Sequence, residues 1–240
     1  MDSVTDPGIA IVGDGRLGRA LSLAMRGADL PVIGPLGRGA DGKDAGIVLL
    51  CVPDSAIAEA ARSIAPGKLV GHCSGASTLA PLSPHEAFSI HPLMTVANNV
   101  SVSFAGAGCA VAGSTERARG VAIQLAKRLR MKPFELKDAD RDLYHAAASL
   151  ASNYLVTLEG AAERLAAIVG VERELLLPLV RAAAENWGRL GARQALTGPI
   201  VRGDLTTTNR QQAAIAQRAP ELLPLWDALT TATRALARNE

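Results

Sequence analysis

Three glycines near the N-terminus are spaced in a way that suits phosphate binding. Gly13, Gly15 and Gly18 follow the apolar run 9–12 in the order G-x-G-x-x-G, and the helix-like segment 19–25 comes next. In such a strand-to-helix turn the glycines permit a tight bend, a close approach of backbone to a pyrophosphate, and close packing of the helix on the strand. The helix N-terminus then attracts the phosphates. The pattern predicts a dinucleotide site; the alternative is an ordinary tight turn. The predicted site comprises Gly13, Asp14, Gly15, Arg16, Leu17 and Gly18.

The residues after the second predicted strand bear on which nucleotide is bound. NAD-binding versions of this turn carry a carboxylate about 20 residues downstream, where it holds the ribose hydroxyls. Here the strand 31–33 is followed by G-P-L-G-R, with no acidic residue at that place. The guanidinium of Arg38 suits a 2′-phosphate, which favours NADP. NAD is the alternative, with Arg38 a solvated loop residue or with Asp41 serving the ribose.

Polar residues follow three further predicted strands, at the sheet edge where ligands bind in open α/β folds. Val52 and Pro53 follow the third strand, Ser74 follows the fourth, and His91 ends the fifth directly before Pro92. We expect the first three beside the cofactor, against the alternative that Val52 and Pro53 only stop a strand before a helix cap. Because a histidine titrates near neutral pH, His91 is a candidate for proton transfer, the alternative being a buried structural histidine.

A polar stripe marks the first long helix predicted in the C-terminal half. His145, Ser149 and Asn153 recur every four residues in an Ala/Leu-rich segment, so they share one helix face. We expect this face at the reaction site, with Asn153 holding a substrate carbonyl or hydroxyl. The alternative is a hydrated face or a hydrogen-bond network between helices.

The loop 196–204 is rich in residues that helix connections rarely need. Its sequence, L-T-G-P-I-V-R-G-D, places Arg202 where it could grip a carboxylate with two hydrogen bonds, beside Thr197 and Gly198. The alternative is a linking loop whose last residues cap the next helix.

Two kinds of architecture must position these residues. From residue 9 to about 137, apolar runs rich in Val and Ile alternate with helix-like segments, which favours a mostly parallel sheet covered on both faces. From 138 onward the patterns are helical. We therefore predict an α/β domain over 1–137 and an all-α domain over 138–240. The strands are expected at 9–12, 31–33, 46–52, 68–72, 88–91, 109–112 and 131–136. The helices are expected at 19–25, 55–64, 115–130, 140–169, 172–190, 206–218 and 220–238.

Composition narrows the class of protein. The 240 residues are 48% hydrophobic, and the net charge of +2 comes without a basic run interleaved with aromatics, which argues against nucleic acid as a partner. No apolar stretch is long enough to cross a membrane, and the segment 1–8 lacks the regions of a signal peptide. Cys51, Cys73 and Cys109 are far apart and form no C-x-x-C, so we expect reduced thiols in a cytoplasmic protein and no metal site.

On these motifs the chain resembles a family of predicted oxidoreductases that join a Rossmann-like NADP-binding domain to a helical domain of unknown function. More distantly it is similar to pyrroline-5-carboxylate reductase, ketopantoate reductase, prephenate dehydrogenase and the β-hydroxyacid dehydrogenases. The resemblance implies a helical domain like the C-terminal domain of 6-phosphogluconate dehydrogenase, and a homodimer. The segments that carry it are G-D-G-R-L-G, H-C-S-G, S-I-H-P-L, Y-H-A-A-A-S-L-A-S-N-Y and L-T-G-P-I-V-R-G-D.

The resemblance also implies roles for single residues. Asn153 resembles the substrate-side asparagine of the hydroxyacid and ketopantoate enzymes, which carry a catalytic lysine where this chain has Ser149. His91-Pro92-Leu93 resembles the His-Pro segment of prephenate dehydrogenases, so His91 or His145 would replace that lysine. The loop from 198 to 207 resembles the Gly/Thr-rich substrate loop of pyrroline-5-carboxylate reductase.

Two functions follow from these observations. The first is an NADP-dependent reductase or dehydrogenase that transfers hydride between nicotinamide and a C=O or C=N group of a small carboxylated metabolite, such as a keto acid like ketopantoate or a cyclic imine. The second is a non-catalytic NADP(H) sensor, favoured by the missing lysine. The polar stripe and the Arg202 loop favour the enzyme. An Ala/Leu-rich helical domain of about 100 residues is also suited to bury one face against a second copy.

Overall fold

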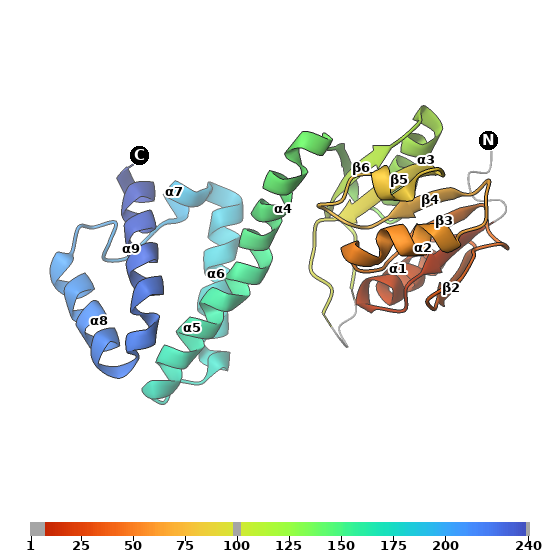
Figure 1. The fold of residues 1–240 in the computed structure, drawn as a ribbon. Helices are drawn as coiled ribbons and strands as arrows, with labels where there is room; N and C mark the ends of the chain where they lie inside the picture. The colour runs from red at the N-terminus through yellow and green to blue at the C-terminus, as the bar shows by residue number, and fades with distance from the viewer. Residues whose placement is uncertain (1–7, 98–101, 239–240) are drawn as a thin grey trace. The chain divides into compact units, whose positions relative to one another are not determined.

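The computed structural model describes residues 8–97 and 102–238 (Figure 1). The chain divides into two compact units, Met1–Ser152 and Asn153–Glu240. The first seven residues, which carry most of the argument against a signal peptide, lie outside the described residues. Each unit is treated by itself below.

The first unit is built on a seven-stranded sheet with the strand order β2-β1-β3-β4-β5-β6-β7 (Figure 1). Neighbouring strands are parallel, except that β5 and β6 are antiparallel. The strand β1 has β2 on one side and β3 on the other, so the winding direction reverses there. The carboxyl ends of β1 and β3 therefore form the switch point at which open α/β sheets bind ligands. The strands are β1 (Ile9–Val12), β2 (Val32–Leu36), β3 (Ile47–Leu50), β4 (Leu69–His72), β5 (Glu86–Pro92), β6 (Gly108–Gly113) and β7 (Lys132–Glu135).

Helices pack on both faces of this sheet. Ile9 and Ile11 belong to one buried cluster, whereas Ala10 and Val12 belong to another, as the two-residue period of a strand requires. The first cluster includes residues of α1 (Arg16–Gly27) and α3 (Glu116–Arg128), and the second includes residues of α2 (Ile57–Ser63). The predicted mostly parallel sheet, covered on both faces, is confirmed.

The second strand runs further than its sequence suggested. We expected it to end at Ile33, because Gly34 and Pro35 usually interrupt a strand, but β2 continues to Leu36. It is the edge strand of the sheet, and a proline that lacks an N–H group is tolerated at an edge. Gly34 has a φ of +106°, and a Cβ there would lie 2.7 Å from the Ile11 carbonyl oxygen. Glycine therefore makes the irregular register between β1 and β2 possible.

The rest of the chain is helical, as predicted: beyond Glu135 the described residues form no strand. One change concerns the long helix expected over 140–169, because a π-helical turn, Leu150–Tyr154, joins α4 (Arg141–Ser149) to α5 (Leu155–Ile168). The following helices are α6 (Arg173–Leu190), α7 (Ala192–Ala195), α8 (Leu205–Arg218) and α9 (Leu223–Arg238).

Within the second unit, polar side chains tie the helices to one another. Arg164 of α5 pairs with Glu221, which precedes α9, and Gln212 of α8 donates a 2.6 Å hydrogen bond to Asp227 of α9. Gly170 and Gly191, each with a φ of +77°, follow α5 and α6. Such a backbone conformation is common where a helix ends.

The domain boundary expected after residue 137 stays a prediction. The last strand ends at Glu135, so secondary structure changes where the sequence pattern changes. The two compact units, however, divide after Ser152, because α4 packs within the first unit. Along the described ranges, none of the helices combines the length and the apolar character that crossing a membrane requires.

Candidate functional site

The glycine turn lies at the switch point of the sheet. The Gly13 N–H donates a 2.8 Å hydrogen bond to the Leu36 carbonyl, and a Cβ on Gly13 would lie 2.3 Å from the Cys51 carbonyl oxygen. A Cβ on Gly18 would lie 1.9 Å from the Gly13 carbonyl oxygen. Packing within the protein therefore explains these two glycines, whose Cβ atoms would overlap Cys51, directly after β3, and the turn itself.

Gly15 has a different reason to be glycine. A Cβ there would meet nothing within 4 Å, so contacts inside the protein do not demand it. Gly15 stands at the N-cap of α1, and no side chain caps the N–H groups of that helix's first turn. Open space beside uncapped N–H groups is the cradle that a pyrophosphate needs.

Charged side chains surround this cradle. Asp14 and Arg19 form a two-pronged ion pair, with Nε–Oδ1 and N–Oδ2 distances of 2.7 and 2.8 Å. The hydrogen bond from Arg19 holds the pKa of Asp14 below its usual value. The carboxylate is thus neutralised beside the turn, and Arg16, at the first position of α1, is exposed. The cradle therefore keeps a positive electrostatic balance.

Arg38, Val52 and Pro53 lie at the same edge of the sheet. Arg38 is exposed in the turn two residues after β2 ends. Val52 is half-buried and Pro53 exposed, in the segment between β3 and α2. Pro53 precedes a short helical turn in which no side chain acts as the cap, so the cap expected there does not form.

Ser74 holds the loop after β4 together. Its Oγ donates a 2.7 Å hydrogen bond to Asp54 and accepts hydrogen bonds from the N–H groups of Ala76 and Ser77. His72 Nδ1 accepts the Ser74 N–H at 3.1 Å, and its Nε2 lies 3.0 Å from the Thr78 carbonyl oxygen. A carbonyl only accepts, so Nε2 carries the hydrogen. His72 and Ser74 both have their hydrogen-bonding groups used inside the protein.

His91 lies in a cluster at the carboxyl end of β5. Its Nδ1 is 2.6 Å from the hydroxyl oxygen of Tyr144, which stands on α4, and its ring centroid is 6.3 Å from that of His145. The Tyr144 ring also packs edge-on against Phe134 of β7, with centroids 5.9 Å apart. The structure thus brings together His91 and His145, two of the predicted residues, and adds Tyr144.

The cluster disfavours positive charge on His91. Burial, reinforced by the electrostatic interaction with His145, lowers the pKa of His91 to about 4, although Asp54 acts in the opposite direction. Burial likewise raises the pKa of Tyr144 to about 12. At neutral pH both groups are therefore uncharged.

Arg141 is a buried charge beneath this cluster. Only 2% of Arg141 is exposed; its Nε lies 2.7 Å from an Asp138 carboxylate oxygen, and a second nitrogen lies 3.4 Å from Ser89 Oγ. A buried guanidinium needs such partners. Its charge also lowers the pKa of His91 and His72. Arg141 therefore holds the start of α4 to the sheet and helps to keep the histidines neutral.

The polar stripe is interrupted where the helix changes type. His145 and Ser149 stand on α4 in the first unit, whereas Asn153 lies in the π-helical turn, at the start of the second unit. A π-helical turn holds one residue more than the α-helical repeat. Asn153 is therefore displaced from the face that ideal spacing would give it. It is exposed, and its carbonyl accepts a 3.0 Å hydrogen bond from Thr157 Oγ1.

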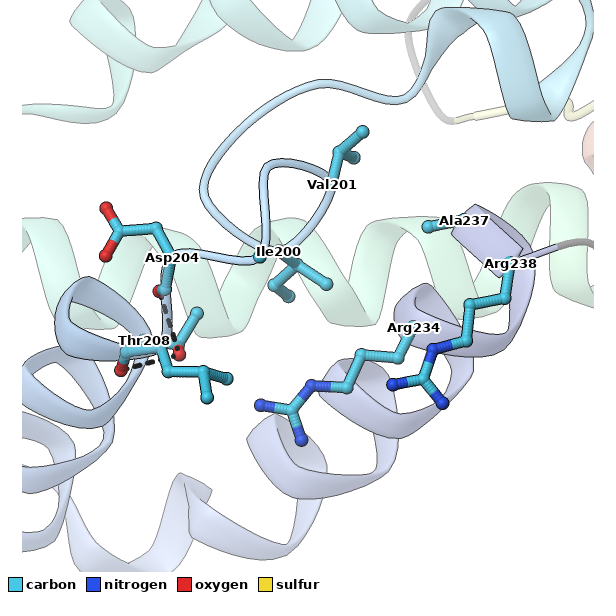
Figure 2. A pocket seen from close by; sticks show the side chains of 9 residues that line it. Ile200, Val201, Asp204, Thr208, Arg234, Ala237 and Arg238 are labelled. Atoms are coloured by element: carbon cyan, nitrogen blue, oxygen red, sulfur yellow. Dashed lines mark hydrogen bonds between the residues drawn. The ribbon is translucent and has the colours of Figure 1, made fainter.

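The loop 196–204 lies in the second unit and borders a cavity (Figure 2). Arg202 is exposed, and the Asp204 carboxylate caps α8 by accepting the Thr207 N–H at 2.9 Å. The guanidinium groups that line the cavity belong to Arg234 and Arg238 of α9, which extend to the same side in Figure 2. The cavity holds about 230 Å³. Its lining residues are Ile200, Val201, Gly203, Asp204, Leu205, Thr208, Arg234, Ala237 and Arg238.

Sequence reasoning missed four residues that the structure brings forward. Tyr144 and Arg141 meet β5 across more than 50 positions of sequence, so no local pattern announces them. Arg234 and Arg238 are four residues apart near the end of a helix, where basic residues are common because of the helix dipole. The burial of Arg141 depends on the elements that cover it, so it cannot be predicted from the neighbouring sequence.

Comparison with known proteins gives a family and a fold. A family model described as a domain of unknown function, DUF2520, matches residues 107–233, more than half of the chain. No curated protein matches the sequence.

Solved structures resemble the whole chain. A Bacteroides fragilis protein, provisionally described as an NADP oxidoreductase, is 19% identical with a TM-score of 0.83, over 97% of this chain and 99% of that one. A Thermotoga maritima protein is 23% identical with a TM-score of 0.77, over 96% and 98%. The pyrroline carboxylate reductase of Plasmodium falciparum, solved with NADP bound, is 13% identical with a TM-score of 0.63, over 95% and 97%. At these identities the likeness shows the fold: a Rossmann-type sheet followed by a helical region.

Proposed function

The chain belongs to the DUF2520 family, whose description names no activity, and from the site itself we propose that it is an NADP-dependent oxidoreductase. Its substrate would be a small carboxylated metabolite with a C=O or C=N group. The observation that carries the proposal is the uncapped glycine turn at the switch point of the sheet, where a Cβ on Gly15 would meet no protein atom. The description of the Bacteroides fragilis protein and the NADP in the Plasmodium falciparum enzyme support it.

The residues of the turn fit the cofactor. The first-turn N–H groups of α1 and the side chain of Arg16 would hold the pyrophosphate, and Arg38 would hold the 2′-phosphate. Val52 and Pro53 would line the ribose next to the nicotinamide, and Ser74 would shape that edge through Asp54. When bound, the reduced nicotinamide supplies hydride to the substrate.

Each unit has its own candidate residues for the substrate. The cluster of His91 and His145 would supply the proton, with Ser149 beside it. Asn153 would orient the reacting oxygen or nitrogen. In the second unit, Arg202 with Thr197 and Gly198 would bind the carboxylate.

Calorimetric titration with NADPH and NADH tests the cofactor assignment. NADPH should bind more tightly, and Arg38→Ala should weaken NADPH about tenfold or more while leaving NADH unchanged, because one charged hydrogen bond is lost. Arg62→Ala, which removes an exposed arginine of α2, is the matched control. Equal affinities that Arg38→Ala does not change would mean that this residue does not read the 2′-phosphate. If NADPH does not bind at all, the oxidoreductase proposal fails.

A sensor is the second candidate, because Ser149 stands where the related dehydrogenases carry a lysine. A sensor would bind NADPH tightly yet reduce no member of a panel of keto acids and cyclic imines. An enzyme would oxidise NADPH with at least one of them, ketopantoate being the first to try.

We further propose that the protein acts as a homodimer joined through its second unit. Among the described residues of that unit, only Thr208, Ile215 and Ala219 are buried. On α6, Leu175 and Leu179 stand one turn apart and are 70% and 69% exposed. A helical unit of this size would gain a core by packing this face against the same face of a second copy, as two-fold symmetric dimers do.

A further inference from the structure

The contact between His91 and Tyr144 joins two distant parts of the first unit. His91 stands at the carboxyl end of β5 and Tyr144 in the first half of α4, and their Nδ1 and hydroxyl oxygen are 2.6 Å apart. The Tyr144 ring is held edge-on between His91 and Phe134. The phenol is therefore fixed at the sheet edge where the proposed function expects the substrate, and Tyr144 is half-buried.

The surroundings of His91 keep its imidazole neutral. Burial is the main cause of its lowered pKa, His145 and Arg141 of α4 add to it, and the carboxylate of Asp54, which follows β3, opposes it. A neutral imidazole is a weak acid, so another member of the cluster is the better candidate for the group that releases the proton. The groups that face His91 are Tyr144, His145 and Arg141 of α4, Asp54 after β3 and His72 of β4.

Tyr144 is the stronger acid of the pair at neutral pH. His91 is uncharged there, so it has no imidazolium proton to release. The phenol keeps its proton throughout the physiological range, since burial raises its pKa to about 12. Tyrosine is among the side chains that act as general acids. An alkoxide formed on a reduced carbonyl is a much stronger base than a phenolate, so the transfer runs downhill.

Resting on the proposed function, we propose that Tyr144 is the residue that protonates the substrate and that His91 is the positioning residue that aims it. Only one hydrogen can lie between Nδ1 and the hydroxyl oxygen. If that hydrogen belongs to His91, the phenolic hydrogen is free to point at the substrate. If it belongs to Tyr144, the phenolic hydrogen is already used. Proton transfer from Tyr144 therefore requires the tautomer of His91 with Nδ1 protonated.

The step balances when the reduced nicotinamide of the proposed function supplies the hydride and is itself oxidised. As the substrate carbon receives hydride, the π electron pair of C=O moves onto oxygen. That oxygen forms a bond to the phenolic hydrogen, and the O–H bond of Tyr144 breaks. The phenolate is stabilised by the N–H of His91 and regains a proton from water. For a C=N group the nitrogen takes the place of the oxygen.

The tautomer of His91 is the first test, and it needs neither cofactor nor substrate. Nitrogen-15 NMR of the full-length protein at neutral pH should show His91 neutral, with hydrogen on Nδ1 and a bare Nε2. In Tyr144→Phe the His91 signals should shift, whereas in Tyr154→Phe, which changes the only other tyrosine, they should not. A bare Nδ1 in the wild-type protein overturns the proposal.

Turnover provides the second test. Tyr144→Phe should leave NADPH affinity within about twofold and lower kcat for NADPH-dependent reduction by about 100-fold or more. His91→Asn, which keeps an N–H near the phenol, should retain more activity than His91→Leu. The wild-type rate should stay level through neutral pH, because the donor is a phenol. A Tyr144→Phe enzyme with unchanged kcat overturns the proposal. Absence of NADPH binding in the wild-type protein would instead overturn the proposed function.

Discussion

At the scale of single residues, two glycines of the same turn are expected to serve different purposes: Gly18 the stability of the fold, and Gly15 the binding of the cofactor. Gly18→Ala would force a Cβ to within 1.9 Å of the Gly13 carbonyl oxygen. We expect it to lower the free energy of unfolding by about 3 kcal/mol, as overpacked sites do. Gly15→Ala meets no protein atom, so it should cost at most about 1 kcal/mol, mostly through a poorer N-cap, and yet weaken NADPH. Urea unfolding and calorimetry on both variants check this. Equal losses of stability would contradict it.

Two histidines whose pKa values are lowered in the folded protein, His91 and His72, make stability depend on pH. The pKa of His91 falls from 6.5 to about 4 on folding, so between these values the unfolded chain binds the extra proton. The free energy of unfolding should therefore rise as pH increases from 4 to 6.5, by a few kcal/mol at most, and level off above. His72 adds a contribution of the same sign.

Urea unfolding at a series of pH values measures this slope. His91→Asn should flatten it in part, because His72 continues to contribute. If His91→Asn keeps the full wild-type slope, the lowered pKa of His91 in the folded protein is contradicted.

Local sequence patterns predicted some of these site residues and missed others. His91 could be placed at a strand end because Pro92 follows it, and Gly13, Gly15 and Gly18 announce their turn by spacing. Tyr144 gave no such sign. Its role depends on a partner 53 positions earlier, and only the packing of α4 on the sheet creates it.

At the scale of elements, a single side chain defines where α3 begins. Thr115 stands at its N-cap, and its Oγ1 accepts the Ala118 N–H at 3.0 Å. Thr115→Ala should lower the free energy of unfolding by about 1 kcal/mol, whereas Thr115→Ser should keep most of it, because serine caps equally well. Thermal unfolding followed by circular dichroism measures both. An alanine variant as stable as the serine variant would show that the cap contributes nothing.

Periodicity predicted which segments are helices and which are strands, but it did not predict two departures from the expected elements. The strand β2 runs through Gly34-Pro35 because it is an edge strand, and edge position depends on strand order. The π-helical turn at Leu150–Tyr154 interrupts a continuous Ala/Leu pattern without any glycine or proline. Both depend on neighbours that a local pattern does not contain.

At the scale of the whole molecule, the exposed face of α6 predicts self-association. Leu175→Glu combined with Leu179→Glu should convert a dimer into a monomer, because charged groups do not tolerate burial in an apolar interface. Sedimentation velocity on the wild-type and double-variant proteins measures this, with Glu185→Gln, on the same helix, as the control. A wild-type protein that is monomeric at high concentration would contradict the dimer.

The order of the α/β and all-α regions could be predicted, because the sequence pattern changes from alternating strands and helices to helices alone. The position of the boundary between the two compact units could not be predicted. It depends on α4, whose residues Arg141 and Tyr144 bond to the sheet although their pattern is that of the helices that follow.

The π-helical turn has an evolutionary consequence. A π-helical turn is wider than an α-helical turn and holds one residue more. About five residues of such a turn advance the chain as far around the helix axis as about four α-helical residues, each of which turns it by about 100°. Removing one residue from Leu150–Tyr154 would therefore restore a regular helix while the side chains of α5 kept their directions about the helix axis. The gain or loss of one codon here is thus a single genetic event whose effect stays within the turn.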